Sequence, residues 1–351
     1  MTAAIIDSAA GSRRHPDGTF RKRLTADQAR REVQGWQAIR DHLPVADLVS
    51  SVTDAGGLHV LIYQDVFAAG RCEHLLADLI SHADQDDRAV PAVRALVDAV
   101  CNSWLHAVGD TGKLRPIGQC RPGLYAARLA PGGRLDDWYG HLRATPVVVD
   151  TGSDVVSLHF AGVLGRLRAE LAPERGCLTA LTQGDPTEPN IAGSSLCWLD
   201  YEHAGLNPVA AEAANLLWYL LAMGGWLVPQ YKPATYAATV GRRRPALPPA
   251  VTHAWIGQDW RRVEVAGQLR AGVGRRAAIT ALLARLRSDL GHAIGPGDVM
   301  DHLWPWLAMR ILGVLPLTAL ADQDAAVCLL KLAQLDGSLA DFAATCPEED
   351  T

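Results

Sequence analysis

The chain has 351 residues, of which 49% are hydrophobic and 20% are charged, so it is large enough for one large domain or two ordinary ones. Its formal net charge of -5 gives no basic signal for nucleic acid or a membrane surface, and we expect neither as a partner. The seven cysteines show no C-x-x-C pair and no zinc spacing, which indicates reduced thiols in a cytoplasmic protein.

No targeting or membrane segment is expected. The N-terminus lacks a basic stretch followed by an apolar core, so no signal peptide is predicted. The apolar stretch 216–228 is too short to span a bilayer, and the stretch 303–320 is interrupted by Pro305, Arg310 and Pro316. We expect both stretches to be buried helices.

The first residues predict a short hairpin. Strands are expected at 3–6 and 19–24, separated by a polar turn. Only Gly11 and Gly18 are available for a loop that covers phosphates, so such a cover is reduced to Ala9-Ala10-Gly11-Ser12 or absent.

A lysine and a glutamate follow on a strand and a helix. Alternation over 19–24 places Lys22 on the apolar face, where its charge needs a partner. The segment 25–42 is typical of a helix with Thr25 as N-cap, and Glu32 is the obvious anion on it. Lys22 and Glu32 therefore form either a functional pair or two ordinary solvated charges. Rival cations for the pair are Arg21, Arg23, Arg30 and Arg31.

The rest of the chain predicts two more strands and then helices. The strands lie at 45–52 and 58–64 around the hairpin turn Asp54-Ala55-Gly56-Gly57. Helices are expected over 73–82, 90–108, 155–171, 210–223, 251–273, 275–290, 299–320 and 323–342.

An irregular segment at 109–145 contains two adjacent acids beside aromatic residues. Asp136, Asp137 and Trp138 are candidates for a pocket that binds a polar or cationic substrate, because aromatic faces attract cations. The alternative is a helix N-terminus with aspartates in its first turn.

The most informative stretch is 178–217. A strand at 178–182 stops at Gln183-Gly184-Asp185-Pro186, and Asn190 follows five residues after Asp185. A second strand at 196–199 ends in Asp200, and the short connection predicts that the two strands pair as an antiparallel hairpin. Asp185, Asn190 and Asp200 would then meet at one end of a small sheet. Their oxygen atoms suit Mg²⁺, which binds one or two carboxylates plus substrate phosphates.

This stretch resembles the aminoglycoside phosphotransferase and choline kinase family, small-molecule kinases distantly related to protein kinases. The family has the patterns H-G-D-x-x-x-x-N and I-D-F/W-E-x-A-G. Two departures are Gln183 in place of the histidine, and Glu212 where the family has an aspartate that braces the catalytic loop. The matching residues are Gly184, Asp185 and Asn190 in the first pattern, and Asp200, Glu202, Ala204 and Gly205 in the second.

The resemblance implies an α+β, bilobal, protein-kinase-like fold. A shortened N-lobe with a small antiparallel sheet would span 1–66, and a large, mainly helical C-lobe would span 67–351. Nucleotide binding would involve Lys22 held by Glu32 and the hinge Gln64-Asp65-Val66, where backbone groups read the base.

The resemblance also implies the chemistry. Asp185 would accept the proton of the substrate hydroxyl, while Asn190 and Asp200 would hold Mg²⁺ against the nucleotide phosphates. Glu202 is a further candidate for substrate contact.

The expected function is an ATP-dependent, or other nucleoside-triphosphate-dependent, kinase. Its acceptor would be a hydroxyl of a small molecule such as an aminoglycoside, another natural product, an amino alcohol or a sugar. The alternative is a non-catalytic kinase-fold protein that binds a nucleotide, a small ligand or a protein partner. A protein kinase is disfavoured because the interval after Asp200 is too short for an activation segment.

Overall fold

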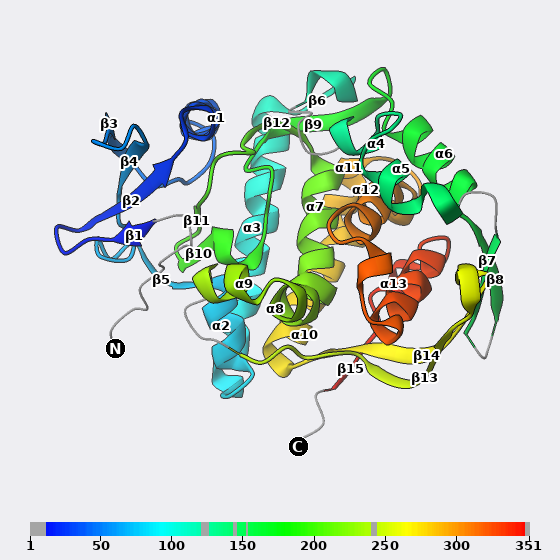
Figure 1. Ribbon diagram of the computed structural model, residues 1–351. Coiled ribbons are helices and arrows are strands. Elements are labelled where there is room, and N and C mark those ends of the chain that lie inside the picture. Colours follow the sequence, from blue (N-terminus) through cyan, green and yellow to red (C-terminus); the bar gives the residue numbers. More distant parts are fainter. Residues whose placement is uncertain (1–11, 121–125, 143–145, 152–153, 240–243, 348–351) are drawn as a thin grey trace.

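The computed structural model describes residues 12–120, 126–142, 146–151, 154–239 and 244–347. The strand predicted at 3–6 and most of the predicted phosphate cover at 9–12 lie outside them. A small sheet with one helix lies at one end of the molecule and a large helical region at the other (Figure 1). The predicted α+β class, with a small antiparallel-sheet lobe and a large mainly helical lobe, is confirmed.

The small lobe consists of four antiparallel strands and helix α1 (Ala26–Ile39). Thr25 accepts a hydrogen bond from the backbone of Gln28, and the Gln28 side chain accepts one from Thr25 N–H, so a capping box begins α1 where the sequence predicts. The strands pair in the order β1-β2-β4-β3. Their bounds are β1 Arg13–Arg14, β2 Thr19–Leu24, β3 Leu48–Thr53 and β4 His59–Gln64.

Two three-stranded sheets follow at the lobe boundary. One has the order β11-β10-β5, with β5 (Cys72–Leu75), β10 (Ile191–Ser194) and β11 (Cys197–Trp198). The other has the order β12-β9-β6, and its bounds are β6 Lys113–Pro116, β9 Gly176–Thr182 and β12 Gly205–Pro208.

These pairings correct the predicted hairpin between 178–182 and 196–199. β9 pairs with β12 and β6, whereas β11 pairs with β10. The reason is that Ile191–Ser194 is itself a strand, and the two residues between it and β11 make a tighter hairpin than the long loop after Thr182 can.

The large lobe is built around helix α7 (Val209–Trp218), which is buried along its whole length. The predicted end of this helix at residue 223, before Gly224-Gly225, is wrong, because a π-helical segment continues over Tyr219–Leu227. The other long helices are α3 Val90–Thr111, α6 Phe160–Glu170, α10 Val273–Leu286, α12 Val299–Gly313 and α13 Asp322–Gln334. Shorter ones are α2 Leu76–Ala83, α4 Ala126–Leu129, α5 Arg134–Tyr139, α8 Val228–Tyr231, α9 Pro233–Thr239, α11 Asp289–Ile294 and α14 Leu339–Phe342.

A further sheet lies beside α13, far from the small lobe (Figure 1). It replaces the helix predicted at 251–273 with β13 (Ala250–Ile256) and β14 (Arg262–Ala271), and its main order is β13-β14-β7-β8. β15 (Thr345–Pro347) adds to β14 in parallel. β8 (Val155–His159) and β7 (Pro146–Asp150) form a hairpin, so the first five residues of the helix predicted at 155–171 are strand.

In the described part of the chain, every helix is too short or too polar to cross a lipid bilayer.

Candidate active site

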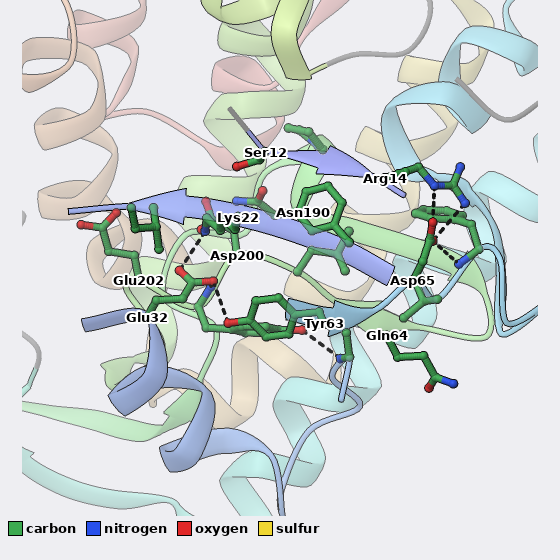
Figure 2. Close-up of a pocket in the computed structure, with 18 of the residues that line it drawn as sticks. Ser12, Arg14, Lys22, Glu32, Tyr63, Gln64, Asp65, Asn190, Asp200 and Glu202 are labelled. Carbon is green, nitrogen blue, oxygen red and sulfur yellow. Dashed lines mark hydrogen bonds and ion pairs between the residues drawn. The ribbon is translucent and has the colours of Figure 1, made fainter. Parts of the chain in front are cut away.

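A cavity of about 330 Å³ lies between the small lobe and the large lobe. β2 and β4 contribute to its small-lobe side, and Asn190 with the segment after β11 contributes to its large-lobe side (Figure 2). The sequence-predicted residues that line it are Lys22, Glu32, Gln64, Asp65, Val66, Asn190, Asp200 and Glu202.

Lys22 connects the two lobes. Its Nζ lies 2.8 Å from Glu32 Oε2 and also forms an ion pair with Asp200 of the large lobe. Glu32 is buried, and its other oxygen accepts a hydrogen bond from the Tyr201 backbone N–H at 3.2 Å. The pairing of Lys22 with Glu32 that the sequence predicts is therefore present, and Asp200 completes it.

Burial opposes charge on all three groups, and mutual attraction outweighs it for Lys22 and Asp200 but not for Glu32. Burial opposes the charge of Lys22, but the carboxylates of Asp200 and Glu32 outweigh it and raise the pKa of the lysine above its ordinary value. Against the effect of burial, Lys22 lowers the pKa of Asp200. Burial raises the pKa of Glu32 despite the nearby lysine. Lys22 is thus a firmly protonated cation facing the cavity.

Asp200 and Asn190 fit a magnesium ion whose other ligands would be phosphate oxygens and water. Asn190 Nδ2 donates to the Asp185 backbone carbonyl at 3.0 Å, which leaves the amide oxygen as the atom suited to a cation. The Asp200 side chain is 45% exposed on the cavity. No cluster of three or more His, Cys, Asp or Glu side chains with metal-binding spacing exists among the described residues. That donor set matches Mg²⁺, which uses few protein ligands, and does not match a metal held by protein alone.

Asp185 lies beside the cavity without lining it. Its Oδ1 accepts hydrogen bonds from Asn215 Nδ2 at 2.8 Å and from an Arg310 guanidinium nitrogen at 3.1 Å. Neither partner was predicted from the sequence. The available signal was a polar residue inside an apolar run, Asn215 within residues 213–218 of α7 and Arg310 within residues 303–313 of α12.

Gln183, which stands at the family's histidine position, ties the loop of Asp185 to the segment of Asp200. Its Oε1 accepts from the Asp185 backbone N–H at 2.8 Å. Its Nε2 donates to the carbonyls of Leu199 and Asp200 at 2.9 and 2.6 Å. The side chain therefore sets the spacing between the two motifs.

Glu212 lies below the same loop. Its Oε2 accepts a hydrogen bond from the Gly184 backbone N–H at 3.2 Å, the bracing contact that the resemblance implies. Gly184 has a φ of 88°, and a Cβ there would lie 2.0 Å from the His203 carbonyl oxygen, so only glycine fits. Burial raises the pKa of Glu212 to about 8.

The predicted hinge lines the far end of the cavity from Lys22 (Figure 2). The buried Asp65 side chain pairs with Arg14, whose Nη2 lies 2.9 Å from Asp65 Oδ1. Arg14 lies over the Phe67 ring, 4.9 Å from its centre. The Asp65 side chain thus fixes β1 to the segment Gln64-Asp65-Val66.

The predicted substrate residues lie apart. Glu202 is on the cavity rim, where it pairs with Arg31 of α1 at 2.6 Å. Asp136 and Asp137 are in the first turn of α5, which is the alternative that the sequence offered, and Asp136 also pairs with Arg168. Neither these aspartates nor Trp138 line the cavity.

No protein-family model matches the chain, and no curated protein matches its sequence. Among solved structures, an aminoglycoside phosphotransferase from Streptomyces rimosus in complex with ADP and streptomycin is 15% identical, over 88% of this chain and 92% of that one, with a TM-score of 0.40. A glucosamine kinase in complex with glucosamine, ADP and inorganic phosphate is 12% identical, over 97% and 77% of the two chains, with a TM-score of 0.42.

A thermostable mutant of another aminoglycoside phosphotransferase is 14% identical, over 86% of this chain and 91% of that one, with a TM-score of 0.36. At such TM-scores the likeness says nothing about the roles of individual residues. By their names, these solved structures are of small-molecule phosphotransferases.

Proposed function

We propose that this chain is a kinase that transfers the terminal phosphoryl group of a nucleoside triphosphate to a hydroxyl of a small molecule. One observation carries the proposal. Lys22 of the small lobe bridges Glu32 of α1 and Asp200 of the large lobe at the wall of a cavity between the lobes. A strand lysine held by a helix glutamate, opposite a metal-binding aspartate, is the arrangement that phosphoryl transfer in protein kinases requires.

Each residue then has a role. Lys22 binds nucleotide phosphate oxygens, and the backbone at Gln64-Asp65-Val66 binds the base. Asp200 and Asn190 hold the magnesium ion, which when bound neutralises charge that develops on the phosphates. Little covalent help is needed, because a loose phosphoryl transition state is stabilised mainly by positioning and electrostatics.

Asp185 acts on the acceptor. Asn215 and Arg310 both contact its Oδ1, so the other carboxylate oxygen is the one that accepts the proton of the substrate hydroxyl. Gln183 and Glu212 hold the backbone of this loop in place, so that the proton acceptor stays at a constant distance from the nucleotide end.

The direct test is an acceptor screen. The purified chain is incubated with Mg²⁺, ATP or GTP, and a panel of aminoglycosides, amino alcohols and sugars, and products are analysed by mass spectrometry. We expect one compound class to gain the mass of one phosphate, and Asp185→Asn to abolish that gain. Asp301→Asn, an exposed aspartate of α12, is the matched control and should leave transfer unchanged. Nucleotide binding without transfer to any compound would instead favour a non-catalytic binding protein.

A further inference from the structure

A second buried ion pair connects the loop that joins Asp185 to Asn190 with helix α10. Glu188 belongs to this loop, and Arg275 comes from the first turn of α10, 87 residues further along. The Arg275 guanidinium contacts both carboxylate oxygens of Glu188, and its Nη2 lies 3.1 Å from Oε2. The side chains are 4% and 11% exposed, respectively, and neither lines the cavity.

The surroundings are shaped for this pair. Arg275 also donates to the Leu220 carbonyl at 3.0 Å, inside the π-helical segment Tyr219–Leu227. In the same segment, a Cβ on Gly224 would lie 2.5 Å from Glu188 Oε1. The segment therefore supplies one acceptor to the arginine, and its glycine leaves room for the carboxylate.

Stability alone gives no reason for such a pair. Removing two charges from water costs free energy that their attraction rarely exceeds, and well-packed apolar residues of similar volume often serve as well or better. The sequence position of Glu188 supplies another reason. Only Pro189 separates it from Asn190, and the proline ring fixes the backbone φ between them. A displacement of Glu188 is therefore transmitted to Asn190 through one rigid residue.

We propose that the Glu188–Arg275 pair is a positioning device that sets the Asn190 amide for the magnesium ion of the nucleotide. This rests on the proposed function, because it takes Asn190 as a ligand of that ion. Arg275 touches neither nucleotide nor cation and acts through Glu188 and the loop backbone. Removing a partner that orients a metal ligand typically lowers metal affinity about 10-fold to 100-fold. We expect a loss of about the same order here.

The test separates positioning from folding. Arg275→Met alone leaves a buried carboxylate without its partner, so its unfolding midpoint should fall clearly. The double variant Glu188→Gln/Arg275→Met removes both charges, and most of the lost stability should return. The positioning readout is the ratio of ADP affinities with and without Mg²⁺, measured by titration calorimetry on the full chain.

In the double variant we expect this Mg²⁺-dependent gain in ADP affinity to fall about 10-fold, while ADP affinity without Mg²⁺ stays at the wild-type value. Arg168→Met, which removes another partly buried ion pair, with Asp136, is the control and should keep the full gain. A double variant with the wild-type gain overturns the inference. A wild-type chain whose ADP affinity does not respond to Mg²⁺ contradicts the metal site of the proposed function instead, so the two failures are distinguishable.

A glycine variant covers the case in which the double variant does not fold. Gly224→Ala keeps both charges and pushes the methyl group against the Glu188 carboxylate. It should reduce the same Mg²⁺-dependent gain. Gly165→Ala in α6, where an added Cβ has no neighbour within 4 Å, is its control and should not. An unchanged gain in Gly224→Ala also counts against the positioning role.

Discussion

Arg310 and Asn215 both donate to one oxygen of Asp185, which is the proton acceptor in the proposed function. We predict that Arg310→Met lowers kcat roughly 10-fold or more, because a small shift of the proton acceptor is costly. ADP affinity should stay within about 2-fold of wild type, because Arg310 does not line the nucleotide cavity. Steady-state kinetics with the acceptor found in the screen, together with calorimetry, separates the two effects. A variant that loses ADP affinity and keeps its kcat contradicts this division of roles.

Glu212 makes stability depend on pH. Its folded pKa is raised to about 8 by burial, whereas an unfolded glutamate has a pKa of about 4.3. The folded state therefore binds the proton more tightly, so the contribution of this proton is complete below the unfolded pKa and is lost as pH rises through about 8. Glu212→Gln, which can still accept from Gly184 N–H, should lose less stability than wild type between about pH 6 and pH 9. Urea unfolding at several pH values measures this, and parallel stability curves for the two proteins would contradict it.

The two motifs predict Asp185, Asn190 and Asp200, and the strand and helix patterns at 19–42 with the family resemblance add Lys22 and Glu32. The structure brings four of these five to the cavity and Asp185 next to it. The partners of Asp185 could not be predicted in this way. Asn215 and Arg310 come from helices 30 and 125 residues away, and no local pattern states which helix face meets the loop. The same holds for Arg275, whose contact with Glu188 depends on how α10 packs.

At the scale of elements, errors occurred where partners are distant in sequence. β14 pairs with β7 more than 100 residues earlier, which no local pattern can indicate, and the apolar spacing at 251–273 was assigned to a helix although β13 and β14 form a local hairpin. The burial pattern of β14 alternates over most of its length, which is the period of a strand. In the small lobe, β2, β4 and α1 match the prediction because they have short connections and clear turn and cap residues, whereas β1 lies in the segment predicted as a turn.

Helix α1 carries Glu32 to the site and is held against the large lobe at a glycine. A Cβ on Gly35 would lie 1.9 Å from the Tyr201 carbonyl oxygen, next to Asp200 in the sequence. We predict that Gly35→Ala pushes α1 outward, costs about 1–3 kcal/mol of unfolding free energy, and weakens nucleotide binding by moving Glu32.

Gly109→Ala provides the comparison for that variant. Gly109 is exposed in α3, and an added Cβ meets nothing within 4 Å, so alanine there should stabilise the helix by about 0.5–1 kcal/mol. Thermal unfolding and ADP titration of both variants test this. If both substitutions have the same effect, α1 is not held by close contact at Gly35.

At the scale of the whole molecule, two lobes form one cavity. Lys22 and Asp200 are 178 residues apart in sequence and meet at the cavity wall. If they bind the same Mg²⁺-nucleotide, their effects on its affinity cannot be independent, because residues that share a ligand show coupled energies.

The most direct measurement is therefore a double-mutant cycle on ATP affinity with Mg²⁺ present. We predict that Lys22→Met and Asp200→Asn each weaken ATP binding at least about 10-fold. In the double variant, the total loss of ATP affinity should be much smaller than the product of the two single losses. Lys113→Met, an exposed lysine of β6, should bind as wild type. ATP affinity that is unchanged in both single variants, or losses that simply multiply, would contradict a shared nucleotide site between the lobes.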